Sequence, residues 1–250
     1  MKRSHLIDLP PISNDAEFIR QVAFHEAGHA AAIHIRNKQQ QLPPIYFQIY
    51  INHAYKGNEC TYRAYENANA YLTKIEDGRL IHTLPTSVAK AVSDFTPAQE
   101  YDYQVAFEAD IVNLLAGPLS EANYVALRDD EPINPNLVHL DALHFYGGHS
   151  DIVTINDYID CLELTLAQRQ AKLVSLFLKA FAFIKDPANW RAILTLAEYI
   201  ISSKKNIIVY EDIARRLSEN RKPTAENPQG QFFRSQRYTN KLFISNDQKI

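Results

Sequence analysis

The chain has little cysteine and no long apolar run, and each absence excludes a class of protein. Cys60 and Cys161 are the only cysteines among 250 residues, and they form no Cys-x-x-Cys pair. This pattern argues against a disulfide framework and against a cysteine-type zinc knuckle, and it is typical of reduced thiols in the cytosol. Apolar stretches are interrupted well before the roughly 20 residues that a membrane-spanning helix needs. We therefore expect no transmembrane segment.

The N-terminus also lacks the apolar core of a secretory signal. Lys2, Arg3 and His5 are followed by Pro10 and Pro11 before any sufficiently long apolar run, so we expect a cytoplasmic protein. An excess of basic charge is missing as well, because the formal net charge is -3. Without a basic field, nucleic acid is not an expected partner.

What the chain does have is helical periodicity over most of its length. Apolar residues recur at spacings that suit one face of a helix, from Phe18 onward and again from Val105 onward. Gly117 and Pro118 are expected to bend or break the second of these helices. The predicted helices cover residues 15–38, 97–128, 151–185, 187–203 and 211–219, which makes the fold mainly α.

A small β-sheet is expected between the first two helices. Residues 45–51 alternate apolar and polar side chains with a period of two, which is typical of a strand. Weaker strand patterns lie at 60–65 and 79–83. Residues 1–220 are expected to form one domain, and the polar segment 221–250 is expected to be a flexible or partner-dependent tail.

The segment His25-Glu26-Ala27-Gly28-His29 lies inside the first predicted helix and carries the clearest chemistry. Helical positions four apart project from one face, so the imidazoles of His25 and His29 can converge on one tetrahedral zinc ion. Glu26 is suited to act as the general base that accepts a proton from water. Gly28 would let another element approach the site closely, or would simply serve helix packing.

A third protein ligand is required, and a nearby histidine does not supply it. Metalloproteases of the reprolysin and astacin type carry a histidine ten residues after the first, where this chain has Ile35. His34 points roughly opposite to His25, because each helical residue turns by about 100°. The sequence pattern leaves four candidates open, namely Glu121, His149, Asp151 and Asp157.

Several blocks in order resemble the peptidase domain of the FtsH-type ATP-dependent zinc proteases. They are 24–30 (FHEAGHA), 115–121 (LAGPLSE), 147–152 (GGHSDI) and 207–213 (IIVYEDI). The resemblance implies that Asp151 is the third zinc ligand and that the fold is of the helical zincin type. It departs from the family at Pro118, where an arginine is usual, and in lacking a Pro-Arg-Gly sequence between the first two blocks.

A third departure concerns ATP. The chain has no Gly-x-x-x-x-Gly-Lys-Ser/Thr loop, so it is expected to act without ATP-driven unfolding of substrates. The resulting hypothesis is a stand-alone zinc metalloendopeptidase that acts on peptides or unfolded proteins. Two alternatives keep the same metal site: a non-proteolytic regulatory or adaptor domain, and a hydrolase of some non-peptide amide.

Further expectations concern substrate and partners. The strand at 45–51 is a candidate for pairing with an extended peptide. Four side chains are candidates to stabilise an oxyanion, and the tail is a candidate contact for a protein partner or a second copy of the chain. The oxyanion candidates are Tyr46, Tyr50, His53 and His82.

Overall fold

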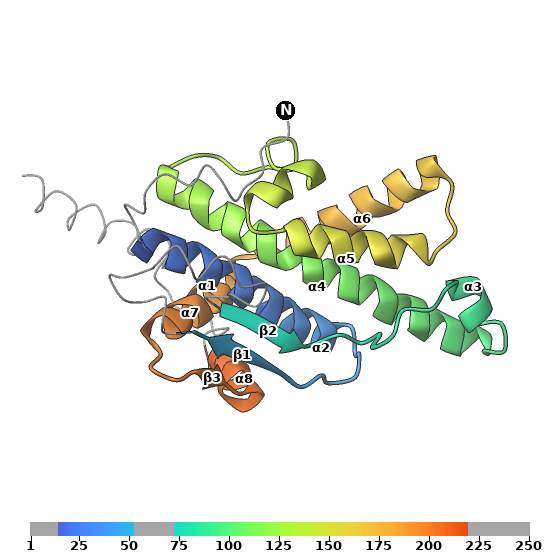
Figure 1. Cartoon of the computed structure of the whole chain (residues 1–250), viewed down its shortest axis with the longest axis horizontal. Helices are drawn as coiled ribbons and strands as arrows, with labels where there is room; N and C mark the ends of the chain where they lie inside the picture. Colours follow the sequence, from blue (N-terminus) through green and yellow to red (C-terminus); the bar gives the residue numbers. More distant parts are fainter. Residues whose placement is uncertain (1–14, 53–72, 220–250) are drawn as a thin grey trace, which may run out of the picture.

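Helices dominate the fold, with the long helix α4 (Pro97–Asp129) at its centre (Figure 1). The computed structural model describes residues 15–52 and 73–219. Helix α1 (Asp15–Ala31) packs on α4, and α4 also contacts α5 (His149–Asp160) and α6 (Leu166–Lys185). The remaining helices are α2 (Asn37–Gln39), α3 (Val88–Ala91), α7 (Pro187–Ser202) and α8 (Tyr210–Glu219). The mainly helical class predicted from the sequence is confirmed.

Helix α1 is anchored by an aromatic contact at the centre of the core. The ring of Phe24, which is fully buried, stacks on Tyr124 at 4.3 Å and on Trp190 at 5.6 Å between centroids. Tyr124 belongs to α4 and Trp190 to α7, so this contact joins three helices. It fixes the rotation of α1 and therefore which of its faces is turned toward α4. The predicted helix at 15–38 is confirmed, with a π-helical turn at Ala32–Arg36 before α2.

Gly117 and Pro118 were expected to bend or break the helix, and α4 passes through them without a break. Proline removes one backbone hydrogen bond, and close packing on both sides of these two residues supports the helix. A Cβ atom at Gly117 would lie 2.2 Å from Nε2 of His29, and one at Gly148 would lie 2.8 Å from Cβ of Pro118. Tertiary contacts have therefore outweighed local propensity at this point.

The predicted helix at 151–185 is wrong as a single element, because the chain forms α5 and α6 instead. Between them, Glu163 has a positive φ of 51°. Thr165 then starts α6 with a capping box, in which its side chain accepts from the backbone of Gln168 while the Gln168 side chain accepts from the backbone of Thr165. This pairing satisfies backbone groups at a new helix start. The helices predicted at 187–203 and 211–219 are confirmed as α7 and α8.

The small sheet has three antiparallel strands in the order β2-β1-β3. They are β1 (Phe47–Ile51), β2 (Thr73–Asp77) and β3 (Ile207–Ile208). The strand predicted at 45–51 is confirmed, but 79–83 forms no strand and β2 precedes it. Because β1 is central, it is not an edge to which a peptide could add as a strand; within the described residues the edge positions belong to β2 and β3. The strand predicted at 60–65 lies outside the described residues.

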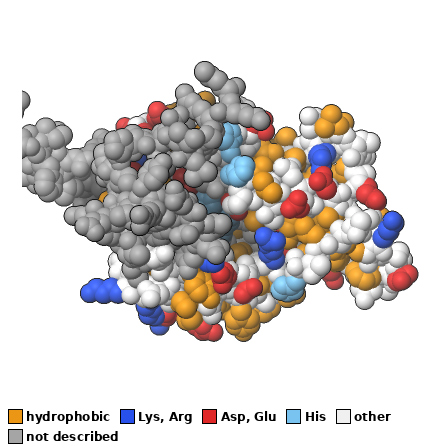
Figure 2. All heavy atoms as spheres, viewed as in Figure 1, with side chains coloured by type: hydrophobic (Ala, Val, Ile, Leu, Met, Phe, Trp, Pro, Cys, Tyr) orange, Lys and Arg blue, Asp and Glu red, His pale blue; other side chains and the backbone are white. Residues whose placement is uncertain are grey.

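The surface agrees with the balanced charge of the sequence. On the described part of the face in Figure 2, acidic and basic side chains are interspersed rather than gathered by sign. None of the described helices combines the length and apolarity that crossing a membrane requires. The predicted tail at 221–250 lies outside the described residues.

Candidate metal centre

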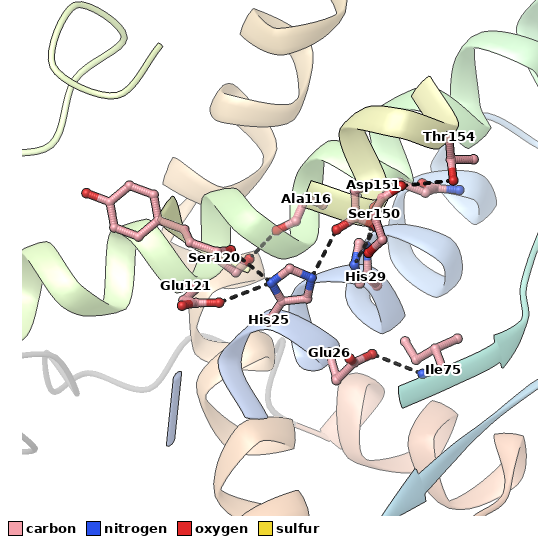
Figure 3. Close-up of polar contacts among 12 residues, drawn as sticks. His25, Glu26, His29, Ile75, Ala116, Ser120, Glu121, Ser150, Asp151 and Thr154 are labelled. Carbon is pink, nitrogen blue, oxygen red and sulfur yellow. Dashed lines mark hydrogen bonds and ion pairs between the residues drawn. The ribbon is translucent and has the colours of Figure 1, made fainter. Parts of the chain in front are cut away.

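His25, His29 and Asp151 come together between α1 and the start of α5 (Figure 3). Each offers one ligand atom, and these atoms all lie within 4.8 Å of one another. Nε2 of His25 is 3.2 Å from Oδ2 of Asp151, and Nε2 of His29 is 3.4 Å from Oδ1 of the same carboxylate. Two ligands bound at about 2.0–2.1 Å to a tetrahedral zinc ion are separated by about 3.3–3.4 Å. The two His–Asp separations are of this size, each to a different oxygen of Asp151, and the three ligand atoms as a group lie within 4.8 Å of one another.

The outer nitrogen of each imidazole is held by an acceptor of the protein. Nδ1 of His25 lies 3.1 Å from Oε2 of Glu121 and 3.2 Å from the carbonyl oxygen of Tyr146. Nδ1 of His29 lies 2.8 Å from the carbonyl oxygen of Asn113. Since both sets of partners accept hydrogen bonds, each Nδ1 carries a proton and donates it. Such contacts leave Nε2 of a neutral histidine free to bind a metal.

The inward contacts are of a kind that a cation can satisfy. In a neutral imidazole with its proton on Nδ1, the Nε2 lone pair faces an oxygen of Asp151, and two acceptors so close repel each other. A proton on His25 would relieve one contact and leave that of His29. A single divalent ion between the three side chains relieves both, so the donor set fits a zinc ion.

The pKa values of the three side chains are shifted from their usual values in different directions. Burial lowers the pKa of His29, which favours the neutral ligand form. Burial also lowers the pKa of His25, but the hydrogen bonds that its ring can donate to Asp151 and Glu121 outweigh burial and hold that pKa well above its usual value. Burial raises the pKa of Asp151, but its electrostatic interaction with His29 and its hydrogen bond with His25 outweigh burial, so its pKa is lowered. Asp151 is accordingly a carboxylate at neutral pH.

Two glycines make room for the histidine rings. A Cβ atom at Gly117 of α4 would meet three ring atoms of His29, the nearest at 2.2 Å. Gly147 precedes α5 with φ of 69°, and a Cβ there would lie 3.0 Å from Nδ1 of His25. Gly28 serves a different purpose, because a Cβ there would meet Oγ of Ser120 at 2.3 Å and the carbonyl oxygen of Ala116 at 2.5 Å. It is therefore a packing residue between α1 and α4.

Glu26 lies beside the ligands and faces the sheet. Its Oε2 accepts a hydrogen bond of 3.0 Å from the backbone N–H of Ile75 on β2 (Figure 3). Burial raises the pKa of Glu26 to about 7, although the charge of His25 opposes this effect. A proton acceptor works best when its pKa is close to the ambient pH. Glu26 and the three ligand residues line one pocket of about 230 Å³.

The pocket contains polar side chains that the sequence pattern did not reveal. Lys74, Arg79 and Asp110 line it together with the metal ligands. Asp110 lies within the apolar pattern of α4 and is only 2% exposed. A carboxylate on the buried face of a helix was the available signal, because such groups are rarely buried without partners.

The other candidates from the sequence lie elsewhere. Glu121 contacts the outer nitrogen of His25, whereas His149 and Asp157 are exposed and are not in the ligand group. His34 lies 3.1 Å from the hydroxyl of Tyr210, in agreement with its predicted place away from the metal. Three oxyanion candidates, Tyr46, Tyr50 and His82, do not line the pocket, and His53 lies outside the described residues.

Comparison with known proteins provides no relative from which a role can be carried over. No protein-family model, no curated protein and no solved structure matches the chain. The chemistry of the site must therefore be argued from its own residues.

Proposed function

We propose that this chain is a zinc-dependent metallopeptidase that hydrolyses peptide bonds without ATP. The observation that carries the proposal is the orientation of the two imidazoles. Both direct Nε2 at Asp151 while protein acceptors hold both Nδ1 atoms, and Glu26 lines the same pocket. Two histidines and a carboxylate as ligands, with a glutamate beside them that does not bind the metal, are typical of hydrolytic zinc sites.

The roles of the residues follow from their positions. A zinc ion held by His25, His29 and Asp151 would supply a Lewis acid that polarises the scissile carbonyl and acidifies water. Glu26 accepts a proton from the attacking water and delivers it to the nitrogen of the leaving amine. Because water is the nucleophile, no covalent bond forms between substrate and enzyme.

The place of β2 supports a peptide as the substrate. The N–H of Ile75 points to Glu26 rather than to β1. The edge of β2 that faces away from β1 therefore carries backbone groups directed toward the pocket. An extended peptide can add to such an edge as a further strand. Its backbone would then pass next to Glu26, which places a peptide bond near the ligands.

Kinship with the FtsH-type peptidases, and with it a zincin-type fold, is part of the proposal. The resemblance rests on blocks distant in sequence, and three residues from them meet at this site. His25 lies between Glu121 on one side and Asp151 on the other. A chance likeness of short blocks gives no reason for them to converge.

A non-proteolytic metal-binding domain is the second candidate. It is favoured by the hydrogen bond that ties Glu26 to the backbone of Ile75, because a structural role would also explain a buried glutamate at this position. A binding-only domain has no need for a proton acceptor with a pKa of about 7, and we therefore rank it below the peptidase.

Metal analysis combined with a cleavage screen tests the proposal. The purified protein is expected to hold about one zinc ion per chain, to lose it in His25→Ala, and to cleave members of a peptide or unfolded-protein library. His149→Ala, an exposed histidine close to Asp151, is the matched control and should keep both properties. Bound zinc without any cleavage, together with specific binding of a partner, would favour the second candidate.

A further inference from the structure

Arg79 lines the pocket that contains Glu26 and Asp151, at the point where the chain leaves β2. Its side chain is exposed, and its positive charge acts on the carboxylates of Asp110 and Asp151. The metallopeptidase chemistry proposed above assigns it no task. Its place beside the reacting groups nevertheless puts it within reach of a bound substrate.

The backbone on both sides of Arg79 is held firmly. Asp77 and Gly78 both have positive φ values, 68° and 90°, which turn the chain sharply after β2. A Cβ at Gly78 would lie 2.8 Å from Cδ1 of Ile33, so this turn is packed against the helical run that carries the ligands. On the other side, the N–H groups of Leu80 and Ile81 each donate to Asp110 over 2.8 Å. The starting point of the Arg79 side chain is thereby fixed.

The nearby carboxylates are already engaged with other groups. Asp110 accepts from Leu80 through Oδ1, and from Ile81 and the hydroxyl of Tyr158 through Oδ2. Both oxygens of Asp151 face the two histidines. Within residues 15–52 and 73–219, Arg79 has no hydrogen bond or ion pair. Its guanidinium is therefore available to an external acceptor.

Lys74, the second cation of the pocket, is in a different situation. Its ammonium forms an ion pair with Glu76 and lies over the ring of Tyr50, 5.6 Å from the centroid. The ammonium of Lys74 is thus engaged within the protein, and as a compact point charge it lacks a planar pair of donors for a carboxylate. The guanidinium of Arg79, by contrast, presents a planar pair of N–H groups that matches the two oxygens of a carboxylate.

We propose that Arg79 binds a carboxylate of the substrate, and that the site therefore prefers peptides with an acidic group close to the scissile bond. This inference rests on the proposed peptidase function and adds a substrate class to it. The carboxylate belongs either to an Asp or Glu side chain or to a free C-terminus. Because Arg79 lines the same pocket as Glu26, this carboxylate belongs to a residue close to the scissile bond.

Peptide binding tests the proposal separately from cleavage. The protein is zinc-loaded Glu26→Gln, and the probes are short peptides of one fixed sequence. A Glu or a Gln is placed in turn at each position, and every peptide is made with a free and with an amidated C-terminus. The Glu–Gln pairs report on a side-chain carboxylate, whereas the free and amidated pairs report on a terminal one.

The expected result is a preference of about tenfold in Kd for one carboxylate peptide over its neutral partner. Adding Arg79→Gln should reduce that preference to less than about twofold, while Lys74→Gln, which removes an equal charge from the same pocket, should retain it. Equal binding of acidic and neutral peptides overturns the inference. It is also overturned if Arg79→Gln keeps the preference or if Lys74→Gln abolishes it to the same extent.

Wild-type cleavage separates this inference from the proposed function. If the wild type cleaves peptides without regard to acidic groups, and binding shows no preference, the peptidase stands and the role of Arg79 fails. If the carboxylate preference depends on Arg79 while the wild type cleaves nothing, the peptidase fails and the binding role of Arg79 stands.

Discussion

Nδ1 of His25 lies 3.1 Å from Oε2 of Glu121, so two residues far apart in sequence meet on the side of the imidazole that faces away from Asp151. This contact makes Glu121 a positioning residue rather than a third ligand. It fixes the orientation of the ring and the nitrogen that carries the proton. Asp151 faces the opposite nitrogen, and the two carboxylates therefore have different tasks.

Glu121→Gln should weaken zinc binding without abolishing it. An amide keeps the shape of the side chain but not its charge, and loss of such an outer partner typically costs about 10- to 100-fold in metal affinity. Competition with a chelator of known affinity measures the change. Glu131→Gln, at an exposed glutamate, is the control and should bind zinc as the wild type does. Unchanged affinity in Glu121→Gln would show that the contact does not position a ligand.

Gly117→Ala should remove zinc binding through a steric effect. The new methyl group would lie 2.2 Å from Nε2 of His29, so the imidazole must leave its place. Because alanine favours the helix more than glycine does, α4 should persist, and circular dichroism should report a folded protein. Zinc content of the purified variant is the measurement. A variant with wild-type zinc affinity would contradict the place of His29 in the site.

The extent to which the sequence predicts this site depends on how local each feature is. The common face of His25 and His29 follows from helical geometry alone, and the structure has it. The approach of Asp151 depends on how α5 packs, so only the resemblance to a known family singled it out. Arg79 could not be found, because its place depends on the turn at Asp77 and Gly78 and on that turn's packing against Ile33.

The fold shows the same division between local and tertiary signals. Strand β1 has alternating burial that its sequence displays, whereas β2 is an edge strand with one buried residue, Thr73, and polar neighbours. Its pairing with β1 is a tertiary interaction without a strong local pattern. The start of α6 could have been predicted from the sequence, because Thr165 and Gln168 have the spacing of a capping box. The continuity of α4 through Pro118 could not, because it depends on contacts with neighbouring elements.

Asp110→Ala should destabilise the fold more than Asp110→Asn. The carboxylate accepts hydrogen bonds from Leu80, Ile81 and Tyr158, and alanine would leave three donors without their acceptor. We expect a loss of about 2–4 kcal/mol in the free energy of unfolding for alanine. Asparagine keeps one acceptor oxygen and should cost less. Urea unfolding of the zinc-free proteins measures both, and equal stability of the two variants would contradict this role for the carboxylate.

Glu108 should contribute stability that disappears in acid. Burial raises its pKa, but hydrogen bonds from Lys172 and Lys179 outweigh burial and lower the pKa below its usual value of 4.5. A carboxyl whose pKa is lower in the folded state stabilises the fold above the unfolded pKa, and loses that effect as the pH falls through the folded value. The difference in unfolding free energy between the wild type and Glu108→Gln should therefore be largest near neutral pH, at most about 1 kcal/mol. It should shrink below pH of about 4.5, and a difference independent of pH would exclude the ion pairs as its cause.

Glu26→Gln isolates the proton transfer from every other property of the site. The side-chain oxygen of glutamine can still accept the hydrogen bond that Ile75 donates to Oε2 of Glu26, so the fold and the position of β2 should not change. His25, His29 and Asp151 are untouched, and the variant should retain zinc. An amide cannot accept the proton of the attacking water, and kcat should therefore fall by about 10²- to 10⁴-fold while KM changes little. Zinc content and cleavage of a peptide found in the library screen are measured on the same preparation. A fully active, zinc-loaded Glu26→Gln would remove Glu26 from the mechanism, because no step that needs a base at this position would then remain.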